Sequence, residues 1–115
     1  MTKSKLNQGI YPLFYDYFFK NFHKIDMNKK LLKFRDFNLV IYDENEPNEN
    51  VINDINVIEY NISCTIFLDA WLEENNMKTN KNYTINIKNI LVKREFNKKD
   101  FHFEEDDLSF EIEII

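Results

Sequence analysis

The chain has 115 residues, of which 43% are hydrophobic and 16% aromatic, and its formal net charge is −5. This length and composition suit a single folded domain covering residues 1–115 and argue against a disordered chain, which would be poor in aromatic residues. No stretch approaches the roughly eighteen apolar residues of a membrane span, and no apolar run of signal-peptide length opens the chain.

The number of cysteines and the amino-acid composition indicate the cellular compartment and the kind of genome. Cys64 has no second cysteine to pair with, so we expect a cytoplasmic protein without disulfides. The richness in Asn, Lys and Ile is typical of an AT-rich genome and points to a low-GC bacterium or its phage. With one glycine and two prolines, tight turns must use Asn and Asp, which tolerate left-handed backbone.

The first predicted element is an amphipathic helix that begins near Pro12, after a flexible leader formed by residues 1–8. Pro12 suits the first helical turn, where its missing N–H has no partner in any case. At about 100° per residue, one face collects a stripe of aromatic side chains that we expect to form core. Leu13 and Tyr17 lie outside that face and are expected to be exposed. The stripe contains Tyr11, Phe14, Tyr15, Phe18, Phe19 and Phe22.

Strand alternation replaces the helical period after Asp26. Residues 31–42 predict a strand with an imperfect apolar face, and the acidic loop DENEPNEN, residues 43–50, follows it. Residues 57–68 alternate most clearly and predict a long half-buried strand. Cys64 lies on the inward side of that strand, which favours packing over a reactive thiol.

The second half of the chain predicts a possible short helix near 69–77 and two further strands. Over residues 82–96 the apolar parity shifts near Lys88 or Asn89, as one extra residue in a β-bulge would produce. Residues 108–114 predict a closing strand whose outward acids, Glu111 and Glu113, discourage pairing at a sheet edge. The sum is an α+β fold: one N-terminal helix packed on an antiparallel sheet of about four long strands, most simply a meander.

No arrangement of residues indicates catalysis, a metal or a cofactor. His23 and His102 lack partners at the spacing of a zinc site or of a nucleophile and its base. The single glycine, Gly9, excludes a glycine-rich phosphate loop, and residues 104–107 lack the spaced ligands of an EF-hand. We therefore expect no enzyme, although carboxylates or a His gathered in one pocket would favour a small hydrolase or nuclease.

Charge alternates in sign by segment, which leaves two interpretations open. The acids are either a solvated surface that keeps the protein soluble or a face that steers a basic protein partner. Basic residues also cluster near aromatics between Lys20 and Arg35, but the net negative charge argues against direct nucleic-acid binding. The candidate partner-binding residues are Asp43, Glu44, Glu46, Glu49, Glu104, Glu105, Asp106, Asp107, Trp71 and Tyr17.

These features favour a small protein-binding protein that presents acidic surface to a basic partner. An immunity protein that neutralises a toxin, or a phage inhibitor of a bacterial defence complex, fits this description by analogy of class. The alternative is a structural or assembly component of a phage particle or secretion apparatus, acting as a homo-oligomer through its sheet edges and through Tyr17, Phe67 or Trp71.

Overall fold

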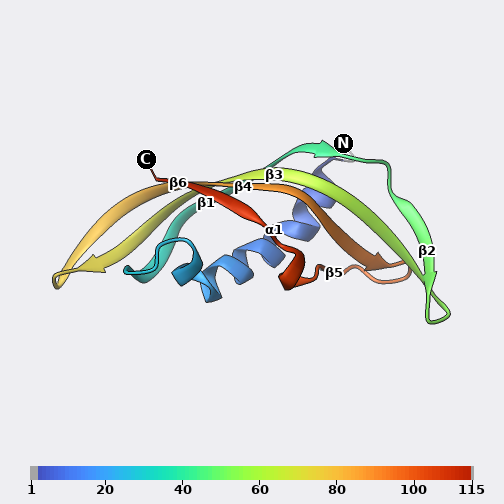
Figure 1. The fold of residues 1–115 in the computed structure, drawn as a ribbon, viewed down its shortest axis with the longest axis horizontal. Helices are drawn as coiled ribbons and strands as arrows, with labels where there is room; N and C mark the ends of the chain where they lie inside the picture. The colour runs from blue at the N-terminus through green and yellow to red at the C-terminus, as the bar shows by residue number, and fades with distance from the viewer. Residues whose placement is uncertain (1–2, 115) are drawn as a thin grey trace.

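The computed structural model describes residues 3–114, with side chains from Leu6 onward, and it consists of one helix lying under an arched antiparallel sheet (Figure 1). This arrangement confirms the predicted α+β fold. In chain order the elements are α1 (Lys3–Lys20), the 3-10 turn η1 (Phe22–Lys24), β1 (Lys30–Glu44), β2 (Asn48–Ile52), β3 (Ile55–Glu74), β4 (Met77–Glu95), β5 (Phe101–His102), the 3-10 turn η2 (Glu105–Asp107) and β6 (Phe110–Ile114).

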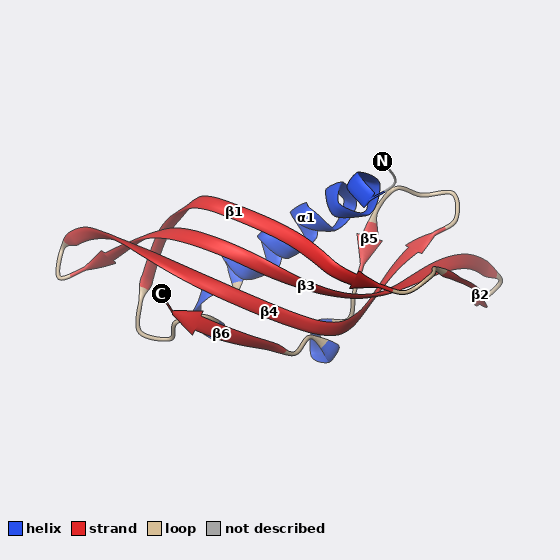
Figure 2. Ribbon diagram, turned by 90° about the horizontal axis from the view of Figure 1, so that it is seen from above, coloured by secondary structure: helices blue, strands red, loops and turns tan. Residues whose placement is uncertain are grey.

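The two longest strands, β3 and β4, form the centre of the sheet (Figure 2). On one side of β3, β1 pairs with residues 62–73 and β2 pairs with residues 55–59. On the far side of β4, β6 pairs with residues 83–87 and β5 pairs with residues 93–94. The middle of the sheet therefore has the order β1, β3, β4, β6, with every pair antiparallel.

Asn and Asp make the tight turns, as the scarcity of glycine predicted. Asn53 and Asp54 join β2 to β3, and Asn75 and Asn76 join β3 to β4. Their φ angles are 51°, 65°, 52° and 62°. Two consecutive residues with positive φ are what a type I′ hairpin turn requires, and its twist matches that of the strands it connects.

The predicted bulge is present at the centre of β4. Ile62 pairs with Ile90 and Cys64 pairs with Ile87, so Ser63 lies opposite two residues, Lys88 and Asn89. Asn89 has a φ of 56°, and its backbone N–H donates a hydrogen bond to the Ser63 hydroxyl over 3.0 Å. The extra residue explains the shift in apolar parity along this strand.

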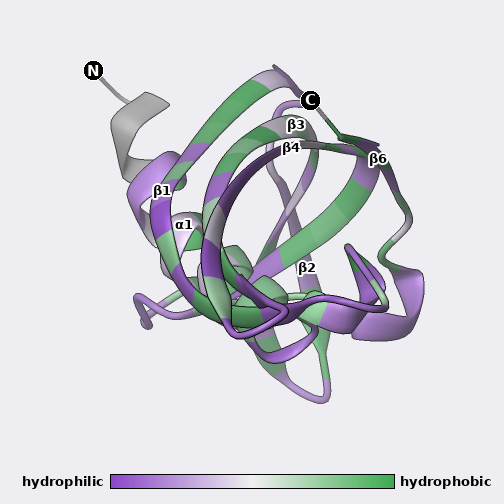
Figure 3. Cartoon of the chain, turned by 90° about the vertical axis from the view of Figure 1, so that its left-hand side faces the viewer, coloured by the Kyte–Doolittle hydropathy of each residue, from purple (hydrophilic) through white to green (hydrophobic). Residues whose placement is uncertain are grey.

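The short helix expected near 69–77 is absent, because β3 continues to Glu74. Leu68, Ala70 and Leu72 are buried at alternate positions, which is the period of a strand and continues the pattern of residues 57–68. Figure 3 shows the same alternation as hydrophobic and hydrophilic bands along the strands. The predicted closing strand is β6, and its last residue, Ile114, is 55% exposed.

The helix α1 begins at Lys3, nine positions before the predicted start, so the expectation of a flexible leader over residues 1–8 is wrong from Lys3 onward. Met1 and Thr2 lie outside the described residues. Leu6 and Ile10 are buried, and the Asn7 side-chain amide donates to the Leu39 carbonyl over 3.0 Å. Burying two such side chains contributes about 1.5–3 kcal/mol each, which offsets a cost of about 3 kcal/mol for a proline inside a helix.

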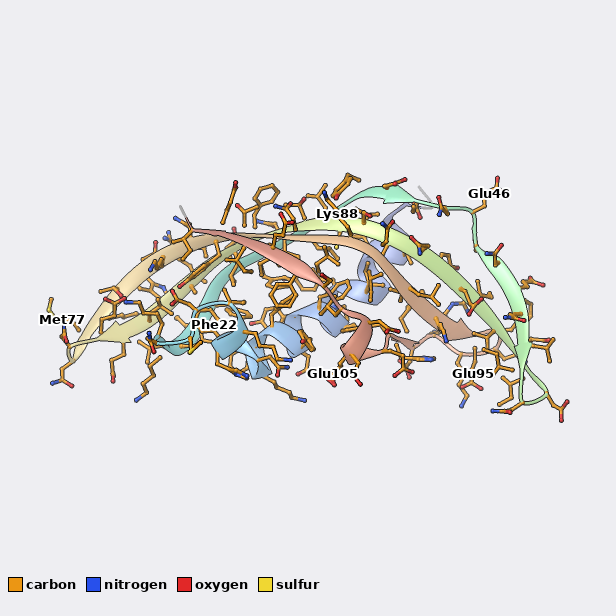
Figure 4. The ribbon with its side chains drawn as sticks, in the orientation of Figure 1. Phe22, Glu46, Met77, Lys88, Glu95 and Glu105 are labelled. Atoms are coloured by element: carbon orange, nitrogen blue, oxygen red, sulfur yellow. The ribbon has the colours of Figure 1, made fainter. Side chains whose placement is uncertain are left out.

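The aromatic stripe forms much of the core between α1 and the sheet, as predicted. Phe14 and Phe18 have no exposed surface, and the Phe18 ring meets Phe110 edge-on at 5.2 Å between centroids. Phe22 lies under the arch (Figure 4). Phe19 was wrongly placed in the core, because it lies at the margin of the stripe and is 45% exposed.

The one glycine lies where α1 crosses β5. A Cβ built on Gly9 would lie 2.3 Å from Cε2 of Phe101, so only glycine lets the ring pack directly on the helix backbone. Within residues 3–114 no helix has the length and apolar character that a membrane crossing needs.

Candidate functional site

The acidic arm, residues 43–56, extends from the last two residues of β1 through β2 to the first two residues of β3. It lies at the end of the sheet away from η1 (Figure 1). Every residue in it is exposed, including all five residues of β2. A strand exposed on both faces contributes little to the core, so core packing does not determine which residues the arm contains.

The charge of the arm is entirely negative. No Lys or Arg occurs between Arg35 and Lys78, and within the described part of the chain no acid of the arm takes part in an ion pair. Unpaired acids concentrated on one projection attract a positively charged partner over distances of about a Debye length, roughly 8–10 Å in ordinary salt. The acids of the arm are Asp43, Glu44, Glu46, Glu49 and Asp54.

Apolar side chains accompany these acids. Val51, Ile52 and Ile55 are 64%, 37% and 45% exposed. Phe96, 53% exposed, lies beside them, because its backbone N–H donates to the Asn56 carbonyl over 2.9 Å. Exposed apolar groups rimmed by charge are typical of a protein-binding surface. Sequence reasoning found the acids but missed these apolar neighbours, whose exposure depends on the absence of a covering layer.

The second predicted acidic segment, Glu104 to Asp107, does not join the arm. Glu104 precedes η2, Glu105 to Asp107 form it, and all four residues are exposed. Figure 4 labels Glu105 below the middle of the sheet, on the side of α1, and Glu46 above the sheet near one end. Glu105 lines a shallow hollow of about 220 Å³ together with Lys20, so a cationic side chain stands near these acids. The two acidic segments therefore do not make one face.

Tyr17 is buried, contrary to the expectation that it is an exposed contact. It is 6% exposed, and its ring packs edge-on against Phe18 and Phe103, with centroid distances of 5.1 and 5.7 Å. Its hydroxyl accepts a hydrogen bond from Lys24 Nζ over 3.2 Å. The chain around Phe103 covers a second side of α1. The helical period of the apolar residues predicts only one buried side, so it could not predict the burial of Tyr17.

Trp71 lies on the outer face of β3 and is half-buried by cations of its own chain. Lys78 Nζ lies 4.5 Å from the ring centroid and the Arg35 guanidinium carbon lies 6.0 Å from it. Arg35 also pairs with Asp69 over 3.4 Å. Cation–π contacts of this kind stabilise the outer face of the sheet and occupy the ring.

The titratable groups in the core have structural roles. Cys64 is fully buried, and this burial raises the pKa of its thiol to about 12, so it remains protonated at neutral pH and is a poor nucleophile. Burial and a hydrogen bond to Asp26 raise the pKa of Tyr83 above its ordinary value. His23 and His102 are exposed on separate elements, and no group of three potential metal ligands gathers among residues 3–114.

A feature that sequence reasoning missed is a hollow on the outer face of the sheet. It has a volume of about 270 Å³. One signal was available, because Phe67 is a large apolar residue at an outward position of β3. The side chains around the hollow come from β1, β3 and β4 and include Asp36, Asn38, Phe67, Asp69, Asn82 and Thr84.

No protein-family model, no curated protein and no solved structure matches the chain.

Proposed function

We propose that the protein is a small non-catalytic cytoplasmic protein that binds and inhibits a basic protein partner. It would act as an immunity protein that neutralises a toxin or as a phage inhibitor of a bacterial defence complex. The observation that carries the proposal is the acidic arm, in which exposed acids without ion pairs in the described part of the chain stand beside exposed apolar side chains.

The two kinds of side chain in the arm have different effects on binding. The acids raise the association rate for a positively charged partner and repel acidic ones, so they contribute mainly speed and specificity. Val51, Ile55 and Phe96 supply apolar area that leaves water when the complex forms, which contributes to the affinity. An arm that projects beyond the core reaches into a cleft of a partner more readily than a flat sheet face does.

Purification of the tagged protein from its native host, followed by identification of the bound protein, tests the proposal directly. With that partner in hand, we expect Glu46→Lys combined with Glu49→Lys to lower the association rate at least tenfold at low salt. Glu104→Lys combined with Glu105→Lys is the matched control, since it makes the same change in net charge on η2.

Two outcomes would contradict the acidic arm as the binding surface. One is an association rate that the substitutions in the arm leave unchanged. The other is an equal loss in both double variants, which would mean that total charge matters and the arm does not. Capture of an acidic partner would contradict the proposed chemistry of the interface as a whole.

A second candidate function is assembly into a homo-oligomer through the sheet edge. Within residues 3–114, β2 pairs with β3 alone, so its other edge leaves backbone N–H and C=O groups available to another strand. Size-exclusion chromatography with light scattering separates the two functions. A monomer at low and high salt favours the inhibitor, and a homo-oligomer that persists in high salt favours assembly.

A further inference from the structure

Two aromatic rings point outward from β3 four residues apart, and their surroundings differ. Trp71 is covered by Lys78 and Arg35. Phe67 is 49% exposed, and among the described residues no other ring stacks on it and no cation lies over it. The same face thus contains one ring that carries cations and one ring that is open to a partner.

The open ring borders the hollow of about 270 Å³, which two rows of paired residues form across three strands. Asn38, Phe67 and Thr84 make one row, and Asp36, Asp69 and Asn82 make the next. Pockets for drug-sized ligands span about 300–1,000 Å³. The hollow is smaller than that and suits the end of a single side chain.

The charge beside the hollow is negative. Asp36 forms no ion pair within the described residues, and its carboxylate accepts hydrogen bonds from Phe37 N and Asn38 Nδ2, each over 3.0 Å. Asp69 accepts from Asn80 Nδ2 and, over 3.4 Å, from Arg35. Each carboxylate oxygen has a further lone pair, so both groups still have capacity to accept hydrogen bonds.

Thr84 adds a hydroxyl group to the lining of the hollow. The residue is 8% exposed and lines the hollow. Its hydroxyl can donate one hydrogen bond and accept others. A donor group of a ligand in the hollow would find this hydroxyl as an acceptor in addition to the two carboxylates.

We propose that the hollow binds the guanidinium group of an arginine side chain presented by the basic partner. This inference rests on the proposed function, which supplies a basic protein as partner. A guanidinium is planar, so it stacks on the Phe67 ring while its N–H groups reach carboxylate and hydroxyl oxygens at its edge. Arg35 already makes this combination of contacts on the same face, with Asp69 and Trp71.

Arginine fits the hollow better than lysine because the acceptors lie at two separate positions beside Phe67, with Thr84 as its cross-strand partner and Asp36 and Asp69 in the next row. Asp36, Asp69 and Thr84 come from three different strands. The planar donor fork of arginine can meet separated acceptors in one geometry, whereas an ammonium group is a compact point charge.

The test uses N-acetyl-arginine amide as the probe, titrated into isotope-labelled protein and followed by amide NMR. We expect the largest shifts at Asn38, Phe67, Asn82 and Thr84. N-acetyl-citrulline amide, which has nearly the same shape without the charge, is the matched control ligand and should cause at least fivefold smaller shifts.

Three variants localise the binding. Phe67→Ala and Asp36→Asn should each weaken binding of the arginine probe about two- to fivefold, and Thr84→Val should weaken it about twofold. Phe19→Ala removes a ring of similar exposure from α1 and should leave the affinity unchanged. Equal shifts with the citrulline probe, or shifts that persist in Phe67→Ala and Asp36→Asn, would overturn the proposal.

The identified partner distinguishes failure of this inference from failure of the proposed function. If charge reversal in the arm slows association while Phe67→Ala does not raise the dissociation rate, the proposed function stands and the arginine pocket is wrong. If Phe67→Ala raises the dissociation rate while reversal in the arm has no effect, the pocket stands and the acidic arm is wrong.

Discussion

Two parts of the same strand, β3, have similar sequence patterns and different environments. Residues 62–72 lie over α1, where Ile62 and Ile66 are 1% and 0% exposed. Ile55, at the start of the strand, pairs with β2 in the acidic arm and is 45% exposed. Alternating apolar residues therefore predict that a strand forms, but a second layer decides whether its side chains are buried.

The lengths of the helix and the strand explain where the covering ends. At 1.5 Å per residue, the 18 residues of α1 span about 27 Å. At about 3.3 Å per residue, the 20 residues of β3 would extend to roughly 65 Å when straight. One helix cannot cover such a strand, so part of the β3–β4 hairpin must project beyond the core. The longest dimension of the molecule is 53 Å, about twice the length of the helix.

The largest effect should come from removing a side chain that packs between α1 and the sheet. Phe18→Ala empties a site with no exposed surface and should lower the free energy of unfolding by about 3–5 kcal/mol. Phe19→Ala, at a 45% exposed position on the same helix, is the matched control and should cost less than about 1 kcal/mol. Urea unfolding followed by circular dichroism measures both. Equal losses would mean that the covered face of α1 is assigned wrongly.

The same residue type in the two parts of β3 gives the sharpest form of the comparison. Ile66→Ala should lower the free energy of unfolding by about 2–5 kcal/mol. Ile55→Ala, in the acidic arm, should lower it by less than about 1 kcal/mol, since the side chain is already half in water. Urea unfolding of the two variants tests this, and a large loss in Ile55→Ala would show that the arm belongs to the core.

A rise in pH should destabilise the covered part through Cys64. Its thiol has a pKa of about 12 in the folded protein against an ordinary value of 9.0. The folded state thus holds the proton more tightly, and the stabilisation is complete below about pH 9 and is lost as the pH rises toward 12. The expected slope is about 1.4 kcal/mol per pH unit in that range.

The variant Cys64→Ala isolates this contribution to the pH dependence. It should have a smaller slope of unfolding free energy against pH, whatever its stability at neutral pH. The slope that remains belongs in part to Tyr83, whose pKa is also raised by burial and by its hydrogen bond to Asp26. Identical slopes in urea titrations between pH 9 and pH 11 would contradict the buried-thiol explanation.

The fold could be predicted from the sequence where local patterns decide it. Alternation identified the strands, and the parity shift located the bulge at Lys88 and Asn89. The helix start was missed because Pro12 resembles a helix beginning, whereas burial of Leu6 and Ile10 extends the helix past it. Residues 69–74 resembled a helix because Leu68, Trp71 and Leu72 fit its period, but cross-strand pairing with β4 decided otherwise.

The candidate sites could be predicted only in part, because they depend on contacts between distant residues. The acids of the arm are visible in the sequence as a run without Lys or Arg. Burial of Tyr17 depends on Phe103, 86 positions away along the printed sequence. The hollow needs the register that sets Asp36 beside Asp69 and Asn82, and no single segment contains that information.

The smallest effects should come from the two hairpin turns, which compare the arm with the rest of the sheet directly. Asn53 and Asn76 both have positive φ, so replacement by Ala introduces strain of about 1 kcal/mol in either turn. Asn76→Ala should lower the global free energy of unfolding by about that amount, because the β3–β4 hairpin unfolds with the core. Asn53→Ala should change global stability less, since the arm can open locally while the core stays folded. Hydrogen exchange separates the two cases: Asn53→Ala should speed exchange at β2 alone, and faster exchange throughout β3 in this variant would mean that the arm and the core unfold as one unit.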